Sequence, residues 1–219
     1  MLLHLPGQAP LRTSHGAPRT RIILTPLSAP ADFARGMPFA AFCHLCAVAL
    51  PPAGPLGSAT ARAALTVPLA GARTLFTSDG AHAWAEWQGR RHGMSATPTT
   101  LENAAISVAL GNHAPGRALA EVIGAAREVR CMGGASAALL AIAGGQLQAH
   151  IDLRGNLTAH DWLAAITILR AAGGEAMLLD EALEQAPPPT KPEQRHGLIA
   201  AASRELLEEL LAMLRRAWL

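Results

Sequence analysis

Carboxylates are scarce in the first half of this sequence. Between Met1 and Leu101 the only acidic residues are Asp32, Asp79 and Glu86. Because hard divalent cations such as Mg²⁺ prefer anionic oxygen ligands, a hydrolytic metal site built from this half would be short of ligands. The formal net charge of +2 is also too small to indicate nucleic acid or an anionic membrane as a partner.

Cysteines and long apolar runs are few as well. The chain has three cysteines, Cys43, Cys46 and Cys131, and this odd number argues against a disulfide framework and for a reducing compartment. No run approaches the roughly 18 apolar residues of a membrane span. The start, MLLHLPGQAP, reaches Pro6 too early for a secretory signal. We therefore expect a soluble cytoplasmic protein that does not bind a membrane.

Apolar residues make up half of the 219-residue chain, although tyrosine is absent. This composition supports a core built mostly from Ala, Leu, Val and Ile, in one large domain or two small ones. Residues 1–20 are rich in Pro, Gly, Arg and His without periodicity, which indicates a flexible arm. We expect residues 21–104 to form an antiparallel-sheet half and residues 105–219 an alternating α/β half of the same structural unit.

Short apolar segments separated by glycines fill the first half. The run FAAFCHLCAVAL, at 39–50, is typical of a central strand buried on both faces. Shorter strands at 22–24, 63–67, 74–77 and 82–88 indicate an antiparallel meander.

Helices and strands alternate in the second half. Helices are expected at 116–127, 135–143 and 160–172, and Ser203 caps a last helix with a wide leucine stripe. Strands are expected at 105–110, 147–153, 176–179 and 197–201. A meander followed by alternating elements predicts a mixed, layered α/β fold.

The most informative segment is HIDLRGNLTAHDWLAAITILRAAGG, from His150 to Gly174. Its first strand ends in Asp152, a polar loop follows, and Asp161 stands at the start of a helix that a double glycine closes. Asp is favoured there as a plain helix cap. The other interpretation is a functional carboxylate that the helix dipole stabilises and that faces a cation in the loop.

The pattern around Asp161 resembles a known family. With Ala164-Ala165 and Gly173-Gly174 after it, this segment resembles the closing motif of the inositol monophosphatase superfamily. The upstream sequence DLRG, at 152–155, is most similar to the archaeal fructose bisphosphatase/inositol monophosphatase branch. Further similar segments occur in the family's order: FARGMPF at 33–39, LFT at 75–77, GRR at 89–91, RCMGGAS at 130–136 and the strand at 197–201.

The resemblance covers roughly residues 21–214 and implies the family's layered αβαβα sugar-phosphatase fold. The family's N-terminal helical portion carries a further metal-binding glutamate, and this chain begins after the place of that portion. We therefore expect the fold without its N-terminal helices, and an apolar face of the first sheet uncovered.

The turn Thr25-Pro26-Leu27-Ser28-Ala29-Pro30 falls on the family's Asp-Pro-(Ile/Leu)-Asp-Gly-Thr motif. In the family the two aspartates bind magnesium and the threonine orients the attacking water. Thr25 and Ser28 stand here for the aspartates and Pro30 for the threonine, and none of them is a strong metal ligand. Of the family's carboxylate cluster only Asp161 remains as a candidate metal ligand. The resemblance therefore predicts no catalytic residue and no resident cofactor.

A substrate site is nevertheless predicted around a glycine-rich helix start. Backbone N–H groups at a helix N-terminus suit phosphate, and the family uses this turn beside its substrate. The candidate substrate-binding residues are Gly133, Gly134, Ala135, Ser136, Asp152 and Arg154. The alternative for the glycines is close helix packing, which small residues allow.

The cysteine and histidine residues carry weaker signals. Cys43 and Cys46, three apart on a strand, point to opposite faces, so core packing is favoured over a metal or redox site. The scattered histidines, among them His160 where the family often has Trp, are interpreted as packing or capping residues.

Three functions remain open from the sequence. The first is a catalytically inactive family member that serves as a structural or regulatory subunit of a homo- or hetero-oligomer, whose partner covers the uncovered face. The second is a Mg²⁺-dependent phosphatase of a small sugar or inositol phosphate with relocated ligands, in which Asp152, Asp161 and Asp32 would cluster. The third is a sugar-phosphate-binding module that uses residues 133–136 and Arg154.

Overall fold

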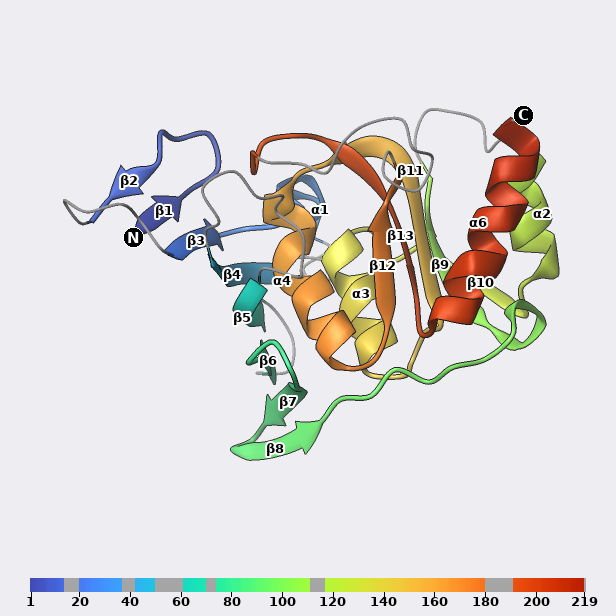
Figure 1. The fold of residues 1–219 in the computed structure, drawn as a ribbon, viewed down its shortest axis with the longest axis horizontal. Coiled ribbons are helices and arrows are strands. Elements are labelled where there is room, and N and C mark those ends of the chain that lie inside the picture. The colour runs from blue at the N-terminus through green and yellow to red at the C-terminus, as the bar shows by residue number, and fades with distance from the viewer. Residues whose placement is uncertain are drawn as a thin grey trace.

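A computed structural model describes residues 1–13, 20–36, 42–49, 61–69, 74–110, 117–179 and 191–218. Two β-sheets enclose a layer of two helices, α3 (Ala135–Ala143) and α4 (Ala159–Ala171) (Figure 1). A second pair of helices, α2 (Arg117–Ala125) and α6 (Arg204–Trp218), covers the far side of the second sheet. The expected mixed, layered α/β fold is confirmed.

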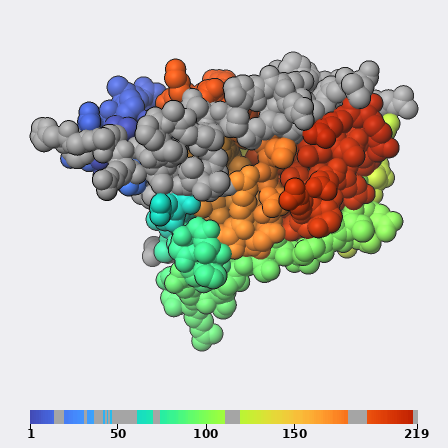
Figure 2. All heavy atoms as spheres, in the orientation of Figure 1, coloured from blue at the N-terminus to red at the C-terminus, as the bar shows by residue number. Residues whose placement is uncertain are grey.

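The first sheet has eight strands in the order β2-β1-β3-β4-β5-β6-β7-β8. Its neighbours are antiparallel except β1 and β3, which are parallel. The bounds are β1 (Leu2–His4), β2 (Leu11–Arg12), β3 (Thr20–Thr25), β4 (Phe42–Ala49), β5 (Ala61–Pro68), β6 (Thr74–Ser78), β7 (Ala83–Trp87) and β8 (Arg90–Gly93). Figure 2 shows the β7–β8 end projecting from the body of the molecule.

Part of the segment 1–20, expected as a flexible arm, is in strands instead. Leu2–His4 pairs with β3 and Leu11–Arg12 pairs with β1, so this segment extends the sheet past its predicted edge. Two- and three-residue strands carry too little periodicity to be recognised from the sequence. Residues 14–19 lie outside the described part of the chain.

Alternation along the first sheet separates its two faces. Ile23 and Thr25 of β3 are buried, whereas Ile22 and Leu24 are half-buried on the opposite face. The buried face packs on α4, and Cys46 of β4 lies 3.8 Å from Thr167 of that helix. Burial raises the pKa of the Cys46 thiol to about 12, which agrees with the predicted core role of this cysteine. The side chain of Cys43 lies outside the described residues.

The second sheet has five strands in the order β10-β9-β11-β13-β12. Its strands are β9 (Ala105–Ala109), β10 (Glu128–Arg130), β11 (Ala149–Leu157), β12 (Glu175–Leu178) and β13 (His196–Ala201). β9, β10 and β11 are parallel, and β13 is antiparallel to both β11 and β12. A short 3-10 helix, η3 (Leu101–Asn103), leads into β9.

β11 is longer than the sequence predicts, and its extension shapes the site. The strand was expected to end at residue 153, with a polar loop after it. Instead it continues to Leu157 through an irregularity between Asp152 and Leu157, where Gly155 has a positive φ of 65°. A bulge of this kind redirects side chains at a strand end. It places Arg154 and Asn156 beside the starts of α3 and α4.

The two inner helices are largely apolar around their circumference, as expected of helices that sheets cover from both faces. α3 contains only Ala, Leu, Ile and one serine, and eight of its nine residues are buried. Its observed bounds equal the predicted ones. α6 differs, since its leucines at 206, 207, 210, 211 and 214 form one buried stripe against the second sheet. None of the helices in the described ranges is both long and apolar enough to span a membrane.

Candidate functional site

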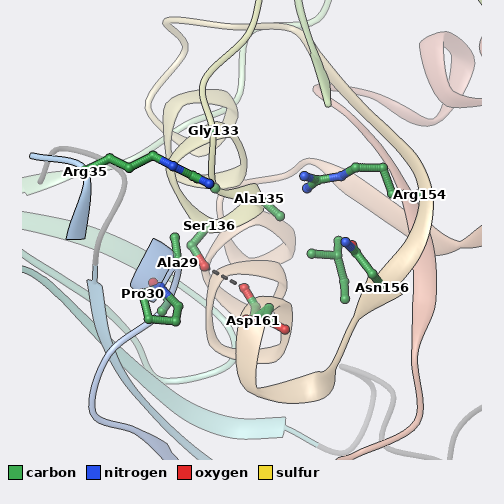
Figure 3. Close-up of a pocket in the computed structure, with 12 residues that line it drawn as sticks. Ala29, Pro30, Arg35, Gly133, Ala135, Ser136, Arg154, Asn156 and Asp161 are labelled. Atoms are coloured by element: carbon green, nitrogen blue, oxygen red, sulfur yellow. Dashed lines mark hydrogen bonds between the residues drawn. The ribbon is translucent and has the colours of Figure 1, made fainter. Parts of the chain in front are cut away.

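A cavity of about 300 Å³ opens where the starts of three helices meet the end of β11. Its walls are the turn 28–30 with Arg35, the loop and helix start at 133–136, and the β11–α4 region with Arg154 and Asp161 (Figure 3). Most of the sequence-predicted site residues therefore come together here. Thr25 and Asp152 do not line the cavity.

The first wall follows β3, and its two hydroxyls are committed to the fold. Thr25 is buried, and its Oγ1 donates to the carbonyl oxygen of His160 at 2.8 Å and lies 3.3 Å from His160 Nδ1. Ser28 is buried as well. Its Oγ accepts the backbone N–H of Phe42 at 3.0 Å, and its own N–H donates to the Phe42 carbonyl at 2.8 Å. These hydroxyls hold the turn in place and do not face a ligand as a pair.

Ala29 and Pro30 set the backbone of the same turn. Ala29 has φ 47°, a left-handed conformation that costs a residue with a Cβ about 1–2 kcal/mol. Pro30 begins the five-residue helix α1 (Pro30–Ala34), where its missing N–H costs nothing. Arg35 follows α1 and reaches the cavity from this side. A strained residue in a cavity wall is typical of functional sites.

The second wall is the start of α3. Gly133 has φ 81°, which only glycine adopts easily, and Gly134 is the N-cap. No side chain caps this helix start, so the first N–H groups of α3 lie at the cavity wall. The partial positive charge at a helix N-terminus makes this wall favourable for an anion.

Ser136, in the first turn of α3, connects this wall to the first sheet. Its Oγ donates to the carbonyl oxygen of Asp161 at 2.6 Å and lies 2.9 Å from His44 Nε2. The other ring nitrogen, His44 Nδ1, lies 3.1 Å from Thr66 Oγ1. Burial lowers the pKa of His44 to about 4, so the imidazole is neutral at physiological pH.

The third wall carries Arg154. Its Nε and Nη2 donate to the Asp152 carboxylate at 3.0 and 2.6 Å, and its backbone N–H donates to the same group at 3.0 Å. Asp152 is fully buried and contacts the cavity only through Arg154. Asp152, predicted beside Arg154 as a substrate ligand, thus lies behind the arginine and orients it.

Asp161 lines the cavity, but its carboxylate is part of the α4 cap. Oδ2 accepts the backbone N–H of Thr158 at 2.8 Å and the Thr158 hydroxyl at 2.9 Å. This is the carboxylate half of a capping box. The plain capping role considered for Asp161 is therefore present in the structure.

Comparison with known proteins gives the fold a family. The family model of the inositol monophosphatase family matches residues 75–219. The chain belongs to the inositol monophosphatase family. No curated protein sequence gives a significant match.

Solved structures of this family share the fold over most of the chain. SuhB from Mycobacterium tuberculosis has a TM-score of 0.70 and 24% identity, covering 90% of this chain and 73% of that one. Inositol monophosphatase from Anabaena has a TM-score of 0.72 and 16% identity, covering 99% and 79%. A Pyrococcus horikoshii protein with similarities to inositol-1 monophosphatase has a TM-score of 0.70 and 20% identity, covering 90% and 71%. Identities this low establish the fold alone.

Members of this family depend on magnesium, yet the residues at this site do not fit a magnesium ion. No group of three or more His, Cys, Asp and Glu side chains gathers anywhere in the described ranges. Asp161 is the one carboxylate among the described lining residues, and it already accepts two hydrogen bonds. Arg35 and Arg154 line the same cavity, but a guanidinium group is not a metal ligand, and the charge of Arg154 is already balanced by Asp152.

The cluster that relocated magnesium ligands would require is likewise not formed by the described side chains. Asp152 is paired with Arg154, and Asp161 caps α4. The side chain of Asp32 lies outside the described residues.

Sequence reasoning missed Arg35, Asn156 and the link between Ser136 and His44. Arg35 directly follows α1 in the family-like segment at 33–39, which was not interpreted as part of the site, and Asn156 lies in what was expected to be a loop. His44 and Ser136 are 92 positions apart, so only the packing of β4 against α3 brings them together. An arginine shortly after the degenerate turn was the one available signal.

Proposed function

We propose that this family member has lost magnesium-dependent hydrolysis and binds a phosphorylated small molecule, of the sugar or inositol phosphate class, as a regulatory or structural subunit. One observation carries the proposal. The groups that stand at the family's metal positions are satisfied within the fold, while guanidinium groups and a helix N-terminus line the cavity.

The charges around the cavity support a phosphate ligand. Arg35 and Arg154 extend toward the cavity from opposite sides, with the start of α3 between them (Figure 3). Guanidinium groups bind phosphate through paired N–H donors, and helix N–H groups add further donors. A cavity of about 300 Å³ suits a small ligand such as a monosaccharide phosphate.

The outer face of the first sheet supports the subunit part of the proposal. This face carries half-buried or exposed apolar side chains: Ile22, Leu24, Leu65, Val67 and Leu75. In the part of the chain that the structure describes, the helices of eight or more residues pack elsewhere, between the sheets or on the second sheet. Apolar faces of this kind mark interaction sites, and a second copy or another protein would cover it.

Thermal unfolding with added ligand tests the binding proposal. Glucose 6-phosphate and inositol 1-phosphate are added in EDTA to the wild-type chain and to Arg154→Gln and Arg35→Gln, with Arg90→Gln on β8 as the matched control. A ligand at 100 times its Kd should stabilise the wild type by about 2.7 kcal/mol. The control should respond equally, and both cavity variants should respond less. If none of these phosphates, nor inorganic phosphate, raises the Tm, the binding proposal is wrong.

A further inference from the structure

A chain of three side chains from three elements ends in the cavity. Ser136 of α3 lies 2.9 Å from His44 Nε2 of β4, and His44 Nδ1 lies 3.1 Å from Thr66 Oγ1 of β5. All three residues are buried, and Ser136 is also a lining residue of the cavity. The order is hydroxyl, imidazole and second hydroxyl.

This order is the one that activates a serine for nucleophilic attack. An activated nucleophile needs a base within hydrogen-bonding distance and a third group that orients the base. The Thr66 hydroxyl can donate or accept, so either tautomer of His44 is satisfied. The Ser136 proton has two acceptors, the Asp161 carbonyl oxygen at 2.6 Å and His44 Nε2 at 2.9 Å. In the tautomer with the proton on Nδ1, where His44 donates to Thr66 Oγ1, a turn of the Ser136 hydroxyl directs its proton at Nε2.

The cavity would hold an electrophile beside this serine. Arg35 and the start of α3 line the same space as the Ser136 side chain (Figure 3). A phosphate held by these groups has its oxygens neutralised, which favours attack at phosphorus. Ser136 is the one residue of the second wall with a hydroxyl side chain.

We propose that Ser136 is a nucleophile toward a phosphate ester bound in this cavity, with His44 as the base. The Ser136 Oγ–P bond forms, the bond between phosphorus and the ester oxygen breaks, and the Ser136 proton passes to His44 Nε2. The departing alkoxide takes its proton from water, and the phosphoryl group stays on Ser136. This inference rests on the proposed binding of a phosphorylated ligand.

The phosphoserine should persist after it forms. Its hydrolysis needs a second activated water, and Asp161, the carboxylate that lines the described cavity, is held by Thr158. The expected behaviour is one transfer per chain with little turnover, which agrees with the loss of magnesium-dependent hydrolysis.

The test uses p-nitrophenyl phosphate, whose leaving group departs without a proton. The full chain is mixed with it in EDTA, and p-nitrophenolate release and the intact mass are followed. We expect a burst that approaches one p-nitrophenolate per chain and a mass increase of about 80 Da, one phosphoryl group, on the peptide that contains Ser136. Ser136→Ala should abolish the burst, and His44→Gln should slow it at least about 100-fold. Ser95→Ala, outside this cavity, should leave it unchanged.

A parallel measurement separates this inference from the proposed function. Inorganic phosphate is added to the same wild-type and Ser136→Ala proteins in EDTA, and the Tm is recorded. If phosphate raises the Tm but no burst or mass increase appears, the nucleophile is disproved and the binding proposal stands. If phosphate leaves the Tm unchanged, the binding proposal is wrong, and the inference that rests on it is wrong as well. A phosphoryl group on a residue other than Ser136 also overturns the inference. The burst and the modified peptide are measured on the wild-type protein, so the test holds even if His44→Gln does not fold.

Discussion

In the turn 25–30, which resembles the family's metal-binding turn, the described hydroxyl side chains serve the fold. Thr25 and Ser28 donate to and accept from neighbouring backbone, and Ala29 occupies a left-handed position that a glycine would fill without strain. The family resemblance places a glycine at this position. The side chains that the resemblance places at metal positions therefore make structural hydrogen bonds.

Ala29→Gly should stabilise the protein. The substitution removes the strain of a Cβ at φ 47°, and the greater freedom of glycine in the unfolded chain offsets part of the gain. We expect a net gain of about 0.5–1 kcal/mol in the free energy of unfolding, measured by urea denaturation. Ala120→Gly in the middle of α2, on an exposed position, is the matched control and should destabilise by about 1 kcal/mol. A loss of stability in Ala29→Gly would show that the backbone at Ala29 is not strained.

Two of the buried histidines, His44 and His150, should make stability fall in mild acid. Burial lowers the pKa of both His44 and His150 to about 4, whereas the unfolded value is near 6.5. Between these values the unfolded chain binds more protons, so stability is lost as the pH falls from about 6.5 to 4. Each histidine contributes at most roughly 3 kcal/mol to this loss.

Urea denaturation at pH 7.5, 6 and 5 measures this dependence. His150→Gln should flatten the pH dependence, because it removes one of the two histidines whose pKa burial lowers to about 4. His92→Gln on the exposed strand β8 should leave the slope as in the wild type. Equal slopes for all three proteins would show that buried histidines do not set the acid sensitivity.

At the scale of elements, the start of α4 decides how Asp161 is used. The carboxylate accepts both polar hydrogens of Thr158 and so closes the first turn of the helix. The same helix presents its apolar faces to both sheets, which fixes Asp161 at the cavity edge. Both capping hydrogen bonds end on Oδ2, so the cap uses part of the acceptor capacity that a metal ion would need.

Asp161→Asn should therefore act on stability. We expect a loss of about 1 kcal/mol, the usual effect of weakening a helix cap. Thr158→Ala should cost a similar amount, and the double variant should cost less than the sum because both changes remove one interaction. Calorimetric unfolding of the three variants measures the coupling between Asp161 and Thr158. If the two losses of stability simply add, the capping interaction between these residues is disproved.

Elements with long, uniform patterns were predictable from the sequence, and those set by tertiary contacts were not. The bounds of α3 match because its apolar run ends in glycines, and α6 shows its stripe directly. β1, β2, β8 and β10 are short, and the β11 extension depends on a bulge. In the site, the motif residues at 133–136 and Arg154 were identified, whereas Arg35, Asn156 and His44 reach the cavity through packing between distant segments.

The whole molecule is a four-layer arrangement of sheet, helices, sheet and helices (Figure 1). The inner helices and the second sheet are covered on both faces, and the outer helices bury their apolar residues against the second sheet. The first sheet differs, because the apolar side chains of its outer face stay partly accessible. The site lies at the inner side of the same sheet, next to the starts of the inner helices. A partner on the outer face would therefore contact strands that also carry His44 and Thr25.

Self-association through the outer face of the first sheet should be weakened by a charged side chain on that face. Leu75 is 38% exposed on β6 and pairs with Glu86 across the strands. We expect the purified chain to show a native mass above that of one chain, and Leu75→Glu to shift it toward one chain with little change in Tm. Leu110→Glu, at a 51% exposed leucine after β9, is the matched control. A stable monomer of the wild type would remove the support for self-association, and co-purification of a different chain would indicate a heteromeric partner.

At the positions that resemble the family's metal ligands, we infer that the side chains now serve the fold. Titration of the wild-type chain with Mg²⁺ by calorimetry, together with phosphate release from a panel of sugar and inositol phosphates, tests it most directly. We expect no magnesium binding heat and no Mg²⁺-stimulated phosphate release. Magnesium binding that Asp161→Asn abolishes, accompanied by Mg²⁺-dependent release of phosphate, would contradict it.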